Sequence, residues 1–170
     1  MELMKLFEER FSVRKFSDKK VEKEKVDLIL EAGRLAPTAV DFQPQRIFVL
    51  ESEKALADLK NCTIFHFDAP LAILVCYDKN ESWQRKYDGH NMGEVDASIV
   101  ATHMMLEVAN LGLGTTWVGH FDPQAIINTY KLPENFVPVA LFPIGYPAND
   151  AEPSPKHFER KQITETVKYL

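Results

Sequence analysis

Residues 70–78 read PLAILVCYD, and this stretch decides the fold because it is apolar without any alternation. A strand with one face in solvent alternates apolar and polar residues, whereas a strand covered on both faces does not. Apolar residues at helical spacing precede it at Val26 and Ile29, and an almost wholly apolar helix is predicted from 94 to 111. The sequence therefore predicts a helical layer on either side of a small mixed sheet.

Three further strands are predicted around this one. Residues 46–52, RIFVLES, are rich in β-branched and aromatic side chains, and residues 114–119, GTTWVG, form a short strand after the apolar helix. Residues 136–147 contain Pro138 and Pro143, which predict a bulged or edge strand because proline cannot donate to a ladder.

Helix ends carry their usual signals. Ser52 is placed to cap the helix that follows it, and Asp122 caps another with Pro123 at its first position. Gly112 follows the long apolar helix, where a glycine commonly ends the helix.

Two polar segments lie outside these elements. Residues 78–93 are long for a connection, which predicts either a lid or a mobile surface loop. Residues 148–170 are predicted to form an extended C-terminal arm that ends in a short element. The whole chain of 170 residues is expected to be a single domain.

Composition excludes several classes of protein. With 20 Lys and Arg against 25 Asp and Glu, the formal charge of -5 argues against nucleic-acid binding by a uniformly basic surface. Cys62 and Cys76 give neither a disulfide framework nor a zinc motif, which suits a reducing cytoplasm. No export signal is visible, and the apolar run 69–77 is about half of what a membrane span needs. We expect a cytoplasmic protein with no membrane segment.

The first candidate site is Arg10-x-Ser12-x-Arg14. Arginine offers a planar, permanently charged fork that matches phosphate oxygens, and a nearby hydroxyl adds a short hydrogen bond. Alternate residues of an extended segment point the same way, so all three can converge on one anion. The alternative is a solvated basic turn.

The second candidate is the loop between Pro37 and Pro44. Thr38, Asp41 and Gln43 supply both donors and acceptors, which is the equipment for recognising the edge of a planar heterocycle. The prolines stiffen the loop and lower the entropy lost on binding. An ordinary rigid connection is the alternative.

The third candidate lies around Trp117. A dinucleotide-binding fingerprint that begins at Gly112 requires glycine where Trp117 stands, so that class of site is excluded. A strand end remains, where the backbone N–H groups, unshielded at Gly119, approach a flat ligand closely. The alternative is that the glycines only end a helix and start a strand.

Near the carboxyl end, three cations occur within six residues: Lys156, Arg160 and Lys161. A solvated tail is the usual interpretation of such a run, and a second phosphate clamp is the functional one. The five histidines form no HxxxH or HExxH pair, so we predict no metal site. The sequence also contains no motif of a catalytic nucleophile.

These pieces together resemble the nitroreductase family of flavin mononucleotide (FMN) oxidoreductases. Each piece alone is weak, but five in the same order cover nearly the whole chain. The pieces are RFSVRKF at 10–16, APTAVDFQP at 36–44, GLGTTWVG at 112–119, GYP at 145–147 and the basic C-terminal segment.

The resemblance implies an α+β fold, a three-layer α/β/α sandwich with a mainly antiparallel sheet. It also implies an intertwined homodimer with two FMN sites at the interface. In such a site, Arg10 and Ser12 hold the phosphate and ribityl chain, and Arg14 faces the N1 and O2 edge of the isoalloxazine. Arg160 and Lys161 close on the phosphate.

The resemblance assigns the remaining contacts to two other segments. Val118 and Gly119 line the ring face and present a backbone N–H toward N5. The partner subunit contributes the side chains of the second candidate loop, namely Pro37, Thr38, Asp41 and Gln43. Family members often have asparagine where this chain has Asp41, and a carboxylate accepts hydrogen bonds but does not donate them.

The function implied is an FMN-dependent oxidoreductase with ping-pong kinetics. Hydride passes from NADH or NADPH through flavin N5 to a nitroaromatic, a quinone or a similar electron-poor acceptor. The cofactor performs the bond-making, so no catalytic side chain is predicted, and Trp83 and Phe121 are hypothetical aromatic walls for the acceptor. The alternatives are a flavin storage or sensor protein, and a reductive dehalogenase or flavin-fragmenting synthase on the same fold.

Overall fold

The apolar stretch forms the central strand of the molecule. In the computed structural model, which describes residues 2–170, it is β2 (Leu71–Asp78). β2 pairs antiparallel with β1 (Gln45–Leu50) on one side and with β4 (Phe136–Gly145) on the other. β3 (Gly114–Thr115) pairs with the outer side of β4, which gives the strand order β1-β2-β4-β3.

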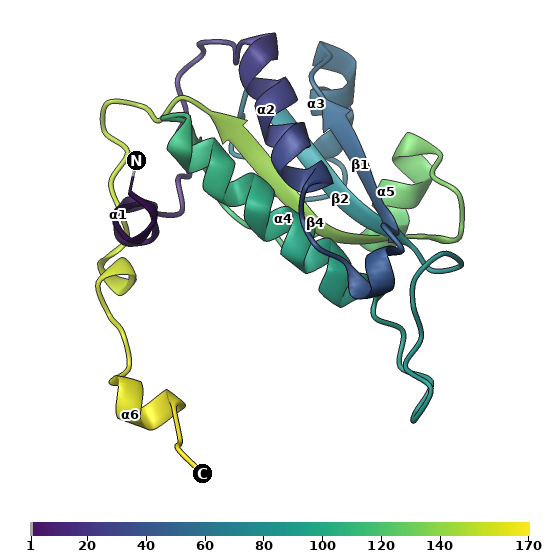
Figure 1. Ribbon diagram of the computed structural model, residues 1–170. Helices are drawn as coiled ribbons and strands as arrows, with labels where there is room; N and C mark the ends of the chain where they lie inside the picture. Colours follow the sequence, from purple (N-terminus) through teal and green to yellow (C-terminus); the bar gives the residue numbers. More distant parts are fainter. Residues whose placement is uncertain (1) are drawn as a thin grey trace.

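Helices cover both faces of this sheet. α2 (Lys23–Arg34) and α4 (Gly93–Asn110) lie on one face, and α3 (Glu53–Leu59) and α5 (Pro123–Tyr130) lie on the other (Figure 1). This arrangement confirms the three-layer α/β/α sandwich.

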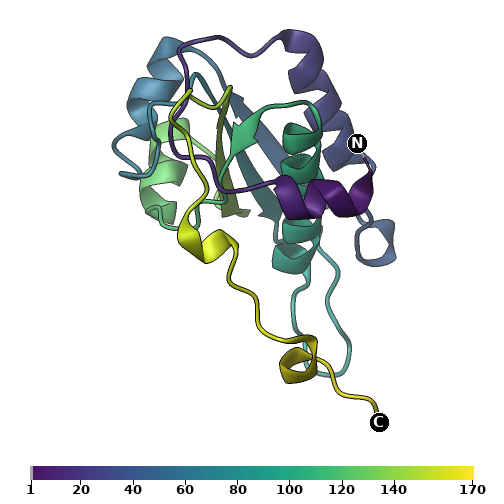
Figure 2. The ribbon, with the colours of Figure 1, turned by 90° about the vertical axis from the view of Figure 1, so that its left-hand side faces the viewer.

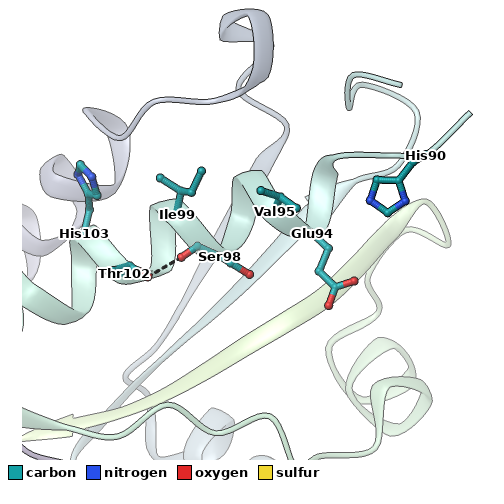
Figure 3. A pocket seen from close by; sticks show the side chains of 7 residues that line it. All are labelled: His90, Glu94, Val95, Ser98, Ile99, Thr102 and His103. Carbon is teal, nitrogen blue, oxygen red and sulfur yellow. Dashed lines mark hydrogen bonds between the residues drawn. The ribbon is translucent and has the colours of Figure 1, made fainter. Parts of the chain in front are cut away.

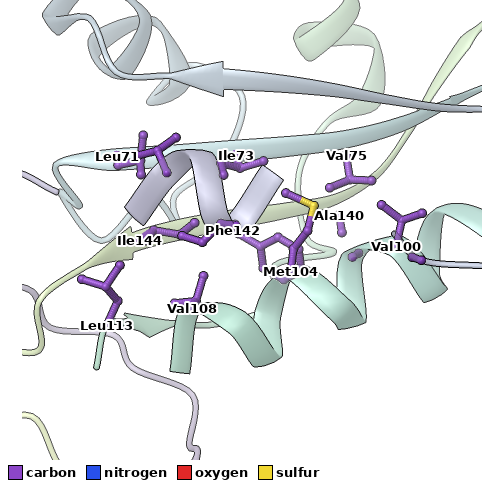
Figure 4. Close-up of a cluster of buried hydrophobic side chains, with 14 of the residues drawn as sticks. Leu71, Ile73, Val75, Val100, Met104, Val108, Leu113, Ala140, Phe142 and Ile144 are labelled. Carbon is purple, nitrogen blue, oxygen red and sulfur yellow. The ribbon is translucent and has the colours of Figure 1, made fainter. Parts of the chain in front are cut away.

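The side chains of β2 alternate between two separate cores. Leu71, Ile73 and Val75 pack with α4 in the first core, where Met104 and Phe142 are almost fully buried (Figure 4). The intervening residues enter the second core with α3 and α5, and they are Ala72, Leu74 and Cys76. Because both faces of β2 are buried, neither set of positions tolerates polar side chains.

The four strands pair antiparallel throughout. The only parallel pairing in residues 2–170 is an isolated bridge between Ser12 and Thr115, so the sheet is mixed only at its margin.

A bulge interrupts the ladder between β2 and β4. Val75 lies opposite Ala140, but Cys76 lies opposite Pro138, so Val139 has no partner on β2. Pro138 therefore occupies an irregular position, which confirms the predicted bulge. The alternative of an edge strand is wrong, because β4 lies between β2 and β3.

The strand predicted over residues 114–119 is shorter than expected. Only Gly114 and Thr115 form a regular ladder, and Val118 then makes an isolated bridge to Leu141. Between these pairings, Trp117 packs edge-on against Phe142 with ring centroids 5.4 Å apart. The chain thus leaves the ladder after Thr115 and pairs with β4 again three residues later, at Val118.

The polar segment between β2 and α4 is a hydrogen-bonded hairpin. Gln84 pairs with Asn91, and the N–H of Arg85 donates to the carbonyl of His90 at 2.9 Å. The hairpin projects beyond the edge of the sheet, below β1 in Figure 1.

Two peripheral segments lie beside each other at one side of the sandwich. α1 (Leu3–Glu9) packs near α4, and the chain after β4 passes α1 before it ends in α6 (Ile163–Thr166), away from the sheet (Figure 2). His157 joins the two, since its Nε2 lies 3.1 Å from the carbonyl oxygen of Glu8. Within residues 2–170, no helix is long and apolar enough to span a membrane.

The helix ends follow the sequence signals, and one of them gives a stability prediction. The hydroxyl of Ser52 accepts a hydrogen bond from the N–H of Ala55 at 3.1 Å and caps α3. Ser52→Ala is expected to lower the free energy of unfolding by about 1 kcal/mol, measured by urea denaturation. Ser52→Asp retains the acceptor and should keep most of the stability. An equal loss in both variants would contradict the capping role.

Candidate functional site

The segment that contains Arg10, Ser12 and Arg14 runs along β3 and is hydrogen-bonded to it. The N–H of Val13 donates to the carbonyl of Thr115 at 3.0 Å, next to the bridge between Ser12 and Thr115. A Cβ added at Gly114 would lie 2.7 Å from Val13, so this glycine is needed for the close approach of the two segments. The contact brings Arg14 to the residues that follow β3.

Arg14 and Gly119 line one open cavity. Its volume is about 220 Å³, and its remaining lining is largely aromatic: Phe65, Phe67, Thr116, Trp117, Val118 and His120. The structure therefore brings Arg14 together with Val118 and Gly119, as expected for three groups that face one ligand.

Neither backbone conformation nor packing within residues 2–170 requires a glycine at position 119. Its φ is not in the left-handed region, and a Cβ added there would meet no described atom within 4 Å. The space above its backbone is open and continuous with the cavity beside Arg14. A flat ligand that approaches the backbone closely is a physical reason for a glycine at this place.

The charged partners of the arginines divide them into two groups. Salt bridges to carboxylates occupy three of the six arginines, namely Arg34, Arg46 and Arg85. The other three are Arg10, Arg14 and Arg160, and no carboxylate within residues 2–170 forms a salt bridge with any of them. These are the three arginines that the sequence assigns to an anionic ligand, and their charge is free to bind one.

Lys15 is adjacent to Arg14, but its charge is already paired with a carboxylate. Its Nζ lies 2.6 Å from Asp150, and this hydrogen bond raises the pKa of the lysine. The pair ties the start of the C-terminal arm to the first motif.

The second candidate loop has an unusual backbone. Val40, Asp41 and Gln43 all have left-handed conformations, with φ between 51° and 56°. The loop is braced internally, because the Thr38 hydroxyl accepts from the N–H of Gln43 and the Gln43 amide donates to Asp41 Oδ1, both at 3.0 Å. The side chains predicted to contact a ligand thus form one preorganised group.

This loop lies at the opposite end of α4 from the first motif. The N–H of Ala39 donates to Asp96 in the first turn of α4 at 2.8 Å. Arg10, in contrast, lines a small cavity with Ala109 and Gly112 at the other end of the helix. An 18-residue helix is about 27 Å long. One chain therefore holds two separated halves of the predicted site.

The C-terminal cations are not joined to either half. Arg160 donates only to the carbonyls of Lys156 and Glu159 among residues 2–170, and Lys161 is exposed. The arm approaches the first motif at His157, whose ring lies edge-on to Phe11. Beyond that contact it runs into solvent (Figure 2).

The outer side of α4 forms a wide groove. Its volume is about 610 Å³, and Val95 on its floor is 41% exposed although it belongs to a largely apolar helix. The residues that line it are shown in Figure 3: His90, Glu94, Val95, Ser98, Ile99, Thr102 and His103. The sequence predicts that this helix runs through the centre or an interface, and one side of it is open.

Sequence reasoning missed part of the cavity wall. Phe65 and Phe67 reach the cavity because Phe67 and Asp68 have φ values of 53° and 47°, a turn that no glycine signals. Phe121, one of the hypothetical walls, instead lines a neighbouring cavity. Within residues 2–170, no cluster of three or more His, Cys, Asp or Glu side chains is placed to hold a metal ion.

Comparison with known proteins identifies the family. The model of the nitroreductase family matches residues 7–64 and 59–146, so this chain belongs to that family. A crystal structure of a nitroreductase family protein from Clostridium difficile 630 superposes with a TM-score of 0.94 at 39% identity, over 99% of this chain and 98% of that one.

Two further relatives carry more specific names. A protein of Methanothermobacter thermautotrophicus with the inferred name NADH dehydrogenase/NAD(P)H nitroreductase is 31% identical over 88% of this chain and 80% of its own. The structure of an FMN-dependent nitroreductase from Clostridium difficile R20291 is 28% identical with a TM-score of 0.77, over 98% of each chain.

Proposed function

We propose that this protein is an FMN-dependent NAD(P)H oxidoreductase that reduces nitroaromatics, quinones or similar electron-poor acceptors by a ping-pong mechanism. The observation that carries the proposal is Arg14, which has no carboxylate partner among residues 2–170 and lines one cavity with the open backbone of Gly119. Membership of the nitroreductase family and the names of its relatives support the same chemistry.

The residues present fit FMN. Arg10 and Ser12 would hold the phosphate and ribityl chain, with Arg160 and Lys161 closing on the phosphate. Val118 and Gly119 would support the ring, and the open space above Gly119 admits a flat group against its N–H. Arg14 would place a positive charge at the N1 and O2 edge, where it stabilises the negative charge of the reduced ring. When bound, FMN supplies the hydride carrier between nicotinamide and acceptor.

A second copy of the chain would complete the site. If two copies pack their α4 grooves antiparallel about a twofold axis, the first turn of one α4 lies beside the last turn of the other. The loop with Pro37, Thr38, Asp41 and Gln43 then comes to the cavity of Arg14 in the partner subunit. The separation of the two halves within one chain supports this homodimer, since neither half alone surrounds a ligand.

Turnover, unlike storage, requires one free face of the flavin ring. The ring would lie with one face against the open backbone of Gly119, and the nicotinamide and the acceptor would bind in turn over its other face. A flavin storage protein would cover that other face with a bulky side chain. We further propose that residues 1–170 form one domain with 148–170 as an arm, and that the protein works in the cytoplasm.

The absorbance spectrum of the purified protein tests this function. We expect flavin bands that bleach when NADH or NADPH is added anaerobically and return when a quinone is added. A protein that remains colourless after incubation with FMN and gel filtration would contradict the cofactor. A yellow protein that neither nicotinamide reduces would contradict the enzyme.

A further inference from the structure

His120 lies next to the proposed reaction face. It directly follows Gly119 and lines the cavity that contains Arg14. It also lines a neighbouring cavity of about 410 Å³, whose other lining residues include Lys60 and Phe121. His120 therefore borders both the cavity of the predicted ligand and a second open cavity.

Two contacts fix this histidine. Its backbone carbonyl accepts a hydrogen bond from the Thr63 hydroxyl at 2.6 Å, and its ring lies edge-on to Phe65 with centroids 5.3 Å apart. Within the described residues no hydrogen bond occupies its ring nitrogens. Asp122, two residues later, is engaged elsewhere, because its Oδ1 accepts from the N–H groups of Gln124 and Ala125.

The other residues of the cavity do not exchange a proton near neutral pH. Arginine stays charged in proteins, and the aromatic and aliphatic side chains carry no acidic proton. The hydroxyl of Thr116 belongs to a buried residue and is a very weak acid. Among the lining side chains, His120 alone has the chemistry of a general acid, and histidine is the side chain that most often fills this role.

We propose that His120 is a catalytic residue that donates the proton to the acceptor. This rests on the proposed function, in which a quinone gains a hydride at one carbonyl oxygen. An O–H bond forms there, the ring becomes aromatic, and the negative charge moves to the second oxygen. A ring N–H bond of protonated His120 then breaks as the second O–H bond forms. The exposed imidazole regains its proton from water.

The test separates proton transfer from electron transfer. Wild type and His120→Gln are loaded with FMN, reduced with dithionite and mixed in a stopped flow with 1,4-naphthoquinone or with ferricyanide. Ferricyanide accepts electrons without a proton. We expect reoxidation of His120→Gln by the quinone to slow at least about tenfold, and reoxidation by ferricyanide to keep the wild-type rate. Wild-type rates with both acceptors, or equal slowing with both, would overturn the proposal.

A variant of the same wall serves as the control. Trp117→Phe alters the cavity but removes no transferable proton, so any change in rate should be the same for both acceptors. Selective slowing with the quinone in this variant also would contradict the assignment. Because dithionite replaces the nicotinamide, a failure of NAD(P)H to reduce the protein counts against the proposed function and not against His120.

Two binding measurements complete the test. The affinity of apoprotein for FMN should be equal in wild type and His120→Gln, because the histidine is not assigned to the phosphate or the ring. The oxidised protein cannot reduce 1,4-naphthoquinone, so binding of the quinone can be followed by proton NMR. The added quinone should shift the ring signals of His120, and the other four histidines serve as internal references. No shift at saturating quinone would overturn the contact.

Discussion

Gly119→Val is expected to remove most FMN binding while the fold stays intact. Among residues 2–170, a Cβ at this position meets no atom within 4 Å, so the backbone there has room for a side chain. The same side chain would occupy the space where the flavin ring must approach the backbone. We expect a loss of affinity of about 100-fold, roughly 3 kcal/mol, in line with the cost of overfilling a packed contact.

Titration of apoprotein with FMN, followed by flavin fluorescence, measures this effect. Urea denaturation of the apoprotein should give a free energy of unfolding within about 1 kcal/mol of wild type, because replacing a glycine mainly restricts the unfolded chain. Gly119→Ala adds a single methyl group and should show a smaller loss. Unchanged FMN affinity in the valine variant would show that the ligand does not lie against this backbone.

Arg10→Ala is expected to weaken FMN retention by roughly 1.5 to 3 kcal/mol, the contribution of a charge-assisted hydrogen bond. This corresponds to a loss of affinity between about 10-fold and somewhat over 100-fold. The guanidinium has no carboxylate partner among residues 2–170, so its removal leaves no buried acid behind.

Arg34→Ala is the matched control for Arg10. Arg34 pairs with Glu31 on the exposed surface of α2, and its loss should leave FMN affinity unchanged. Flavin stoichiometry after gel filtration, with the same treatment for both variants, gives the comparison. Equal retention in Arg10→Ala and wild type would refute the phosphate assignment.

The layered fold was predictable because the sequence of one strand, β2, indicates helices on both faces of the sheet. The apolar run of β2 indicates burial on both faces, and its alternate residues do enter two different cores. The bulge was also predictable, since Pro138 cannot donate to a ladder. Its place inside the sheet was not, because the proline signal is the same for an interior bulge and an edge.

The first motif shows what spacing can predict about a site. Alternate positions predict that Arg10, Ser12 and Arg14 converge on one anion. The segment along β3 has the extended backbone that this needs, but Arg10 and Arg14 line two different cavities. Spacing cannot show which other residues such a segment meets. Phe65 reaches the cavity through a turn with left-handed residues, and His120 reaches it because it follows the short pairing with β4. The local sequence around either residue does not indicate that it lines a cavity.

The proposed two-chain site comes only from the resemblance to a family. Residues 36–44 and 10–16 are distant in sequence, and nothing in their composition reveals that α4 separates them within one chain. The structure adds this physical reason, because a rigid helix of about 27 Å stands between the two halves. A ligand that touches both halves therefore requires two chains.

Native mass spectrometry of the FMN-loaded protein tests the shared site most directly. We predict a dimer that carries two FMN molecules, and loss of the flavin whenever the dimer dissociates into monomers. A monomer that retains one FMN with the affinity of the bulk sample would contradict a site built from two chains.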